Sequence, residues 1–156
     1  MNNWVFLTVG HLPNAKVGEP AHVRTVFCER VKHQFWPLRK STPGRRVVAV
    51  GDNIIFYLAR PECTFVGTAK VSLAAFEVVD SQLREFAAVD KYRAEYGVGI
   101  TSIKLWKAAV EIRPLVPTLE VFPDKDRWGA HFQSGVIRLS NEDYQQILKG
   151  AKGVKN

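Results

Sequence analysis

Residues 51–72 read GDNIIFYLARPECTFVGTAKVS, and this stretch decides the fold. The apolar run in residues 53–59 is typical of a central strand that is buried on both faces. Residues 64–72 alternate apolar and polar side chains, as a strand with one wet face does, and Pro61 and Glu62 predict a turn between the two. Gly67 inside the second strand indicates a bulge, the close approach of another backbone or a ligand, or simple packing. The sequence therefore predicts two paired strands within a sheet.

Further strands are expected on both sides of this pair. Four apolar or β-rich stretches qualify: 4–8 (WVFLT), 47–50, 102–112 and 136–139. The apolar side chains of 102–112 do not all fall on one face of the predicted strand. Trp106 and Val110 lie on one face, whereas Ile103 and Leu105 lie on the other. A bulge or burial on both faces would explain this pattern.

Three segments have the apolar spacing of helices. The first follows Glu19 and Pro20, with Val23, Val26, Phe27 and Val31 at helical spacing. The second is 78–96. The third is 141–148, where Ser140 with Asp143 three residues later resembles a capping box.

These elements give about five or six strands and about three helices in mixed order, without regular βαβ alternation. We expect a single α+β domain over residues 1–149, in which a strongly curved sheet or partial barrel is flanked by helices. Residues 150–156 are small and basic and are predicted to be a flexible tail.

The net charge of +7 is concentrated in one part of the chain. Residues 22–46 contain one acid, Glu29, and seven bases: Arg24, Arg30, Lys32, Arg39, Lys40, Arg45 and Arg46. Seven minus one leaves six of the seven net charges in this region. Such a patch attracts polyanions, although many charge clusters are only solvated surface.

Two segments place aromatic side chains among these or other cations. Residues 33–46 (HQFWPLRKSTPGRR) set Phe35 and Trp36 beside four bases, and two prolines keep the segment out of a helix or central strand. Residues 124–135 (DKDRWGAHFQSG) combine Arg127, Trp128, His131 and Phe132. An aromatic plane next to guanidinium groups suits a nucleobase and its phosphates. The two segments favour one shared pocket, with Trp36 and Trp128 facing each other, unless the tryptophans only cover the edge of the core.

Signals of catalysis are weak. The sequence has no phosphate loop, GxGxxG, GxSxG or HExxH motif, and its four histidines are scattered. Asp52, Asp124 and Asp126 could in principle converge on Mg²⁺, but turn and capping roles are commoner at such positions. We expect no catalytic residues, no metal and no cofactor.

Cys28 and Cys63 are not closely spaced and are expected to be reduced thiols. The opening MNNWVFLTVG lacks the features of a secretory signal, and no apolar run is long enough to span a bilayer. The expected protein is cytoplasmic, monomeric and without a membrane partner.

With these stretches in view, the chain resembles an EVE domain, a member of the PUA-like superfamily that is related to the YTH modified-base readers. Four stretches carry the resemblance: MNNWVFLT, HQFWPLRK, VGDNIIFYLA…TFVGTAKV and DKDRWGAHFQSGVIRLSNEDYQQIL. Their order and spacing cover most of the chain, and the match is loosest over residues 74–100.

The resemblance implies a PUA-like fold and a non-catalytic reader that holds a modified base, flipped into an aromatic pocket, in DNA or RNA. It would make Trp36 the pocket wall and Thr8 the polar floor, with Trp128, His131 and Phe132 coming from the C-terminal block. Leu38 would contact the modified base. The phosphates would be bound by Arg39, Lys40, Arg45, Arg46 and Arg127. The chain departs from the family at residues 37–40 (PLRK) and at Lys70, where an acid is common.

Two alternatives stay open. One is a general RNA-binding PUA-like module without selectivity for a modified base. The other is an enzyme that processes nucleic acid. For a reader, an effector protein would supply any catalytic activity.

Overall fold

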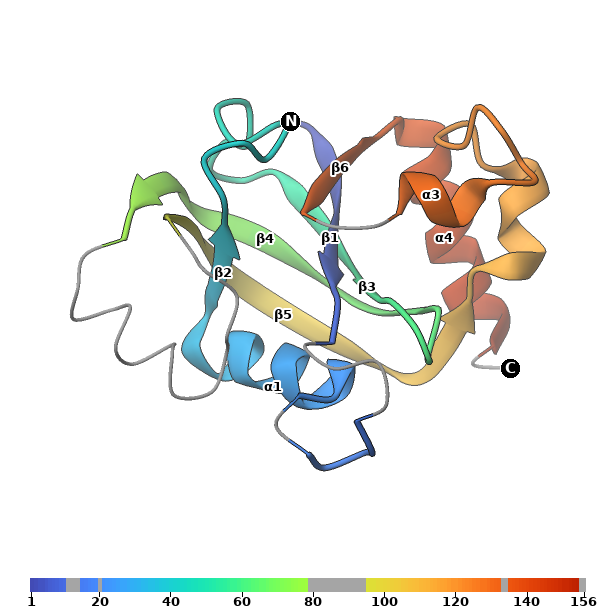
Figure 1. Ribbon diagram of the computed structural model, residues 1–156. Helices are drawn as coiled ribbons and strands as arrows, with labels where there is room; N and C mark the ends of the chain where they lie inside the picture. The colour runs from blue at the N-terminus through green and yellow to red at the C-terminus, as the bar shows by residue number, and fades with distance from the viewer. Residues whose placement is uncertain (11–14, 20, 79–94, 133–134, 155–156) are drawn as a thin grey trace.

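The computed structural model describes residues 1–10, 15–19, 21–78, 95–132 and 135–154. One six-stranded mixed sheet runs through the protein in the order β2-β5-β4-β3-β1-β6 and curls into a half-barrel (Figure 1). Its strands are β1 (Asn3–Thr8), β2 (Phe35–Leu38), β3 (Asn53–Leu58), β4 (Thr64–Glu77), β5 (Tyr96–Glu111) and β6 (Val136–Leu139).

The central pair of strands predicted from the sequence is confirmed, because β3 and β4 are antiparallel neighbours. β1 lies parallel to β3 on the other side, and the remaining pairs are antiparallel. The carboxyl ends of β1 and β3 therefore meet at one edge of the sheet, with Thr8 opposite Leu58.

Gly67 marks a close approach between two backbones. A Cβ atom there would lie 2.3 Å from the carbonyl oxygen of Lys104 on β5. The register shifts on both sides of this point: Phe65 pairs with Val110, whereas Gly67 pairs with Leu105. The bulge explains why apolar side chains of 102–112 fall on both faces of the strand, because it changes which face the following side chains occupy.

Three α-helices and one 3₁₀-helix accompany the sheet in the described residues: α1 (Val23–His33), η1 (Arg113–Thr118), α3 (Trp128–His131) and α4 (Asn141–Val154). Ser140 caps α4 as expected, since its Oγ accepts from the backbone N–H of Asp143. The Asp143 carboxylate binds elsewhere, accepting from the N–H groups of Glu120 and Val121, both at 2.8 Å. It thus ties the start of α4 to the loop that follows η1.

Two sequence expectations about elements were wrong. Residues 47–50 form no strand, because Val47 and Val48 donate their N–H groups to Gly44 O in a turn. Tyr96 begins β5 rather than ending a helix. Most of the predicted helix over 78–96 lies outside the described residues.

α4 also differs from its prediction. It continues past Leu148 to Val154, and Ala151 is buried in the core. Residues 149–154 therefore belong to the helix, and residues 155–156 lie outside the described part.

The two faces of the sheet carry separate hydrophobic cores. On β1, Trp4 and Phe6 belong to one core, whereas Val5 and Leu7 belong to the other. The first core, the half-barrel interior, is covered by Val23 and Phe27 of α1. The second is covered by residues of η1, α3 and α4. No helix in the described part of the chain is long and apolar enough to cross a membrane.

Candidate nucleic-acid interface

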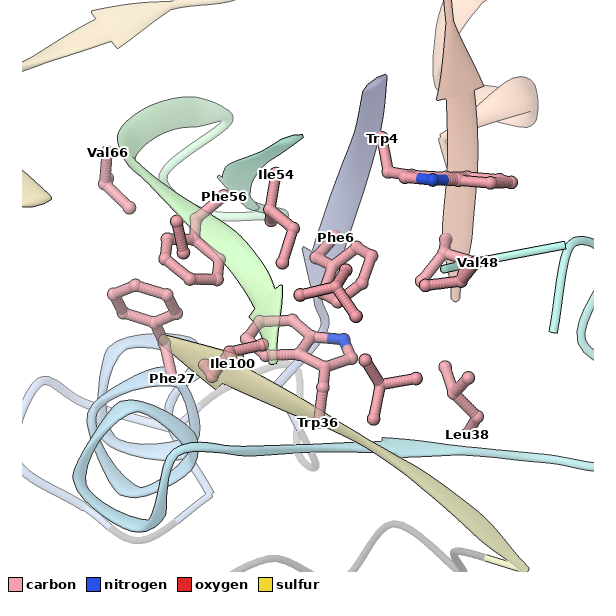
Figure 2. Close-up of a cluster of buried hydrophobic side chains, with 14 of the residues drawn as sticks. Trp4, Phe6, Phe27, Trp36, Leu38, Val48, Ile54, Phe56, Val66 and Ile100 are labelled. Atoms are coloured by element: carbon pink, nitrogen blue, oxygen red, sulfur yellow. The ribbon is translucent and has the colours of Figure 1, made fainter. Parts of the chain in front are cut away.

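Trp36 lies in the half-barrel interior and is 0% exposed. Its indole stacks on Phe56 with ring centroids 5.4 Å apart and lies 5.4 Å from Phe6 (Figure 2). The reason is local: Phe35–Leu38 pairs with β5 as an edge strand, where proline is tolerated, so alternate side chains point inward. The prediction that Phe35 and Trp36 stand in a loop outside the core was wrong.

Thr8 and Leu38 are fully buried as well. Within the described residues, Thr8 Oγ1 and Trp36 Nε1 have no hydrogen-bond partner. Neither residue lines the cavity described below, and nor does Leu38. Ligand contact by any of the three would require the half-barrel interior to open.

Trp36 and Trp128 do not face each other. Trp36 belongs to the half-barrel interior, whereas Trp128 packs against the core on the opposite face of the sheet. The predicted slot between the two indoles is therefore wrong. The sheet itself stands between the two aromatic segments.

A cavity of about 750 Å³ opens instead where β1 and β3 end. Crevices at the carboxyl ends of parallel strands are common ligand sites. Trp128 and Phe132 form an aromatic wall, and Tyr57 adds a third ring. The rings of Tyr57 and Phe132 meet edge to face at 5.2 Å, which fixes the wall. Trp128 is partly exposed, whereas Phe132 is 4% exposed.

Three arginines line the same cavity. Arg60 follows β3, Arg113 begins η1, and Arg127 precedes α3. All three are exposed, and within the described part of the chain none forms an ion pair. One carboxylate, Asp126, also lines the cavity. Three positive charges against one negative charge leave a net positive cavity.

Tyr57 and Cys63 lie together inside this cavity. Burial raises the pKa of Tyr57, and its side-chain hydrogen bond with Cys63 raises it further, whereas Arg60 and Arg113 act in the opposite direction. Tyr57 therefore stays a neutral phenol. Cys28 and Cys63 are free thiols, as expected.

His22 closes the cavity on the side of α1. It caps that helix, and its Nδ1 accepts from the backbone N–H of Arg24 at 3.1 Å. A neutral imidazole with an accepting Nδ1 carries its proton on Nε2.

Of the predicted site residues, the cavity brings together Arg127, Trp128 and Phe132. The side chain of His131 lies outside what the structure describes. The sequence interpretation missed Tyr57, Arg60 and Arg113, and one signal could have found Arg60. If β1 and β3 had been recognised as parallel, the residues following each strand would have marked the crevice.

The basic segment, residues 39–46, forms a second cationic feature. Arg39, Lys40 and Arg46 are exposed, and Arg45 is partly exposed. Leu38 and Val48 anchor its two ends in the half-barrel interior. Arg45 holds its shape: its guanidinium lies 4.1 Å from the ring centroid of Tyr96, and its Nε donates to Lys40 O at 3.2 Å.

The other bases counted with this segment serve different purposes. Arg30 is buried, with its guanidinium 5.0 Å from the ring centroid of Trp36. Arg24 forms an ion pair with Glu62 at 3.0 Å, which ties α1 to the turn between β3 and β4. The seven bases expected to form one patch over 22–46 are thus divided: four lie together in 39–46, whereas Lys32 is exposed on α1.

Arg138 extends the basic segment and was not predicted. It is exposed on β6 directly opposite Trp4, and Gly44 of the segment packs against Trp4 and Val136. Arg138 also donates to Asn2 Oδ1 at 2.8 Å. Because the contact with Gly44 joins residues far apart in the sequence, no local pattern could reveal it.

The basic segment and the cavity are connected at one point. A Cβ on Gly135 would lie 3.1 Å from the Thr42 side chain, and Gly135 is three residues beyond Phe132 of the cavity wall.

Two of the three acids considered for a metal site have structural roles. Asp52 accepts from the N–H groups of Asn2 and Ala49 and from the Trp4 indole. Asp124 Oδ1 accepts from Asp126 N in a turn. Among the described residues, no group of three or more potential ligands could hold a metal ion.

Solved structures with the same fold were found. One is the human THYN1 protein in complex with 5-methylcytosine containing DNA (14% identity, TM-score 0.62, covering 97% of this chain and 98% of that chain). Another is the YTH domain of Zygosaccharomyces rouxii MRB1 in complex with N6-methyladenosine RNA (12% identity, TM-score 0.57, covering 96% of this chain and 86% of that chain). A third is a hypothetical protein from Leishmania major (16% identity, TM-score 0.65, covering 100% of this chain and 98% of that chain). The predicted PUA-like α+β fold is confirmed.

Curated relatives are closer in sequence. No family model matches the chain. A UPF0310 protein of Mesorhizobium japonicum is 30% identical over 115 residues, which cover 70% of this chain and 72% of the relative. A UPF0310 protein of Mycolicibacterium gilvum is 30% identical over 118 residues, covering 70% and 74%. The chain therefore belongs to the UPF0310 family.

Proposed function

We propose that this protein is an EVE-type, non-catalytic module that binds nucleic acid and takes a modified base into the cavity at the ends of β1 and β3. The observation that carries the proposal is the cavity itself, which joins a partly exposed Trp128 to three arginines. Stacking on an aromatic side chain contributes about 1–3 kcal/mol per base.

The basic segment and Arg138 would bind the phosphate backbone. Their contacts are independent of sequence and sensitive to salt. Thr42 of this segment contacts Gly135, three residues after Phe132 of the cavity wall, and one strand would follow both surfaces. Extruding a base from a duplex costs a few kcal/mol, which phosphate contacts and stacking can offset together.

Two of the structural neighbours support this assignment. The human THYN1 structure contains DNA with 5-methylcytosine, and the yeast YTH structure contains RNA with N6-methyladenosine. In this chain, the cavity offers an aromatic wall for a base, and the basic segment offers cations for a strand.

The test is a binding panel of oligonucleotides with and without 5-methylcytosine or N6-methyladenine, in DNA and RNA, at two salt concentrations. We expect the wild type to prefer at least one modified oligonucleotide. Trp128→Ala should remove that preference and weaken binding about 5- to 150-fold, equivalent to the stacking term. Trp128→Phe should retain most of it.

Lys40→Ala combined with Arg46→Ala should weaken binding to all oligonucleotides alike. Both side chains are exposed, and Arg45 stays in place to hold the segment. Lys149→Ala with Lys152→Ala on α4 removes the same charge elsewhere and should have little effect. Equal loss from the Trp128 and Lys40/Arg46 variants, or no preference for any modified base, would overturn the proposal in favour of general RNA or DNA binding.

A further inference from the structure

We infer that the ligand of the cavity carries its own phosphate: the site takes a whole nucleotide with a phosphate monoester, either free or at the end of a strand. This inference rests on the proposed function and names the ligand class of the same site. It follows from the arginines that line the cavity, because a neutral base offers them no negative charge.

The cavity has more cationic groups than a base requires. Arg60, Arg113 and Arg127 come from three different elements and line one cavity with a single carboxylate. Glu62, two residues after Arg60, is already engaged by Arg24. Guanidinium groups suit phosphate because they donate two parallel hydrogen bonds to its oxygens. A monoester presents more charge and more acceptors than a backbone diester.

No residue of the basic segment lines the cavity. The basic segment packs over Trp4 near the start of β1, whereas the cavity begins at Val9, after its end. Five residues of strand span about 16 Å. The arginines of the cavity therefore serve a different phosphate from the one that Lys40 or Arg46 would bind.

The remaining surface of the cavity suits the rest of a nucleotide. The rings of Trp128, Phe132 and Tyr57 form the apolar part, and Arg60, Arg113 and Arg127 line the cavity with them. A volume of about 750 Å³ falls within the range of sites that enclose whole small molecules. It offers more room than an extruded base alone would fill.

The test measures binding of free ligands to the full chain by calorimetry. The probes are 5-methyldeoxycytidine 5′-monophosphate and N6-methyladenosine 5′-monophosphate, each compared with its own nucleoside. At least one monophosphate should bind about tenfold or more tightly than its nucleoside. Arg60→Gln with Arg113→Gln should abolish that difference. Trp128→Ala should weaken the monophosphate and the nucleoside alike.

A second set of probes distinguishes a free nucleotide from a strand end. Oligonucleotides with the modified nucleotide at one end are compared with a 5′-phosphate, a 3′-phosphate or no terminal phosphate. A preference for one phosphorylated end assigns the site to strand ends, whereas tighter binding of the monophosphate than of any oligonucleotide assigns it to free nucleotides and overturns the proposed function.

Controls keep a negative result informative. Lys104→Gln with Lys107→Gln removes two exposed charges of β5 that do not line the cavity, and should leave every affinity unchanged. Equal binding of monophosphate and nucleoside, or unchanged binding in the folded Arg60/Arg113 variant, overturns the inference. If modified internal bases still bind through Trp128 in that case, the proposed function stands. If no probe binds, both fail.

Discussion

The indole nitrogen of Trp4 donates a hydrogen bond to Oδ2 of Asp52 at 2.9 Å, and this buried contact fixes the start of β1 to the turn before β3. The carboxylate also accepts from Asn2 N and Ala49 N, both at 3.0 Å. Burial by itself raises the pKa of Asp52, but these donors outweigh it and hold the pKa below its usual value of 3.8.

Asp52 should therefore make the protein sensitive to acid. A carboxyl group with a lowered folded pKa contributes stability that is present above its unfolded pKa and is lost as the pH falls through the folded pKa. Asp52→Asn should cost about 1–3 kcal/mol at neutral pH, because either amide orientation turns its NH₂ toward an N–H donor. Urea unfolding at a series of pH values measures both effects.

Asp126→Asn is the matched control, because Asp126 is exposed. It should leave the free energy of unfolding and its pH dependence unchanged within about 0.5 kcal/mol. If Asp52→Asn retained the wild-type loss of stability as the pH falls below the usual carboxyl pKa of 3.8, the lowered pKa would not belong to Asp52.

Trp36 should behave as a core residue. Trp36→Ala removes the stacking partner of Phe56 and should cost about 3–5 kcal/mol in the free energy of unfolding. Trp128→Ala should cost less, because that ring is partly exposed. Chemical denaturation of both variants measures the difference. The reverse order of stability would indicate that the half-barrel interior is open around Trp36.

Sequence patterns were sufficient for much of the sheet. β1, β3 and β6 follow apolar runs, and the cap of α4 follows from Ser140. These features depend on neighbours in the chain. The burial of Trp36 depends instead on a distant part of the chain, because Phe35–Leu38 pairs with β5, about sixty residues later. The same is true of Arg30, a base within a basic cluster that turns inward onto that indole.

The cavity, too, could be predicted only in part from the sequence. Trp128 and Phe132 were recognisable as an aromatic pair next to a base, since they lie within six residues. Arg60 and Arg113 join them only because β1 and β3 are parallel and β5 leads into η1 at that end of the sheet. Residue type marked the wall, but topology determined which cations accompany it.

Gly67 should tolerate no side chain. In Gly67→Ala, the new Cβ would lie 2.3 Å from Lys104 O, and backbone on both strands must shift to admit it. We expect a loss of about 1–3 kcal/mol. Gly129→Ala is the control, because a Cβ there has no neighbour within 4 Å. Thermal unfolding compares the two, and a harmless Gly67→Ala would contradict the close pairing of β4 and β5.

Arg138 should contribute one phosphate contact to nucleic-acid binding. Arg138 is exposed on β6 opposite Trp4, which Gly44 contacts, and this places it near the basic segment although the two are about ninety residues apart in sequence. Arg138→Ala should weaken binding of modified and unmodified oligonucleotides alike. It should also make the slope of log K against log salt less negative by about 0.7–0.9, the contribution of one neutralised phosphate. Fluorescence titrations across a range of salt concentrations measure this slope.

The control for Arg138 must separate charge from structure, because Arg138 also donates to Asn2. Arg138→Lys keeps the charge and should restore the wild-type salt slope, whereas Arg138→Gln keeps polarity without the charge and should not. Asn2→Ala removes the hydrogen bond and leaves the cation in place, so its slope should match the wild type. The contrary outcome is that Asn2→Ala makes the slope less negative by as much as Arg138→Ala does. In that case Arg138 would act by holding the start of β1, and the phosphate surface would end at the basic segment.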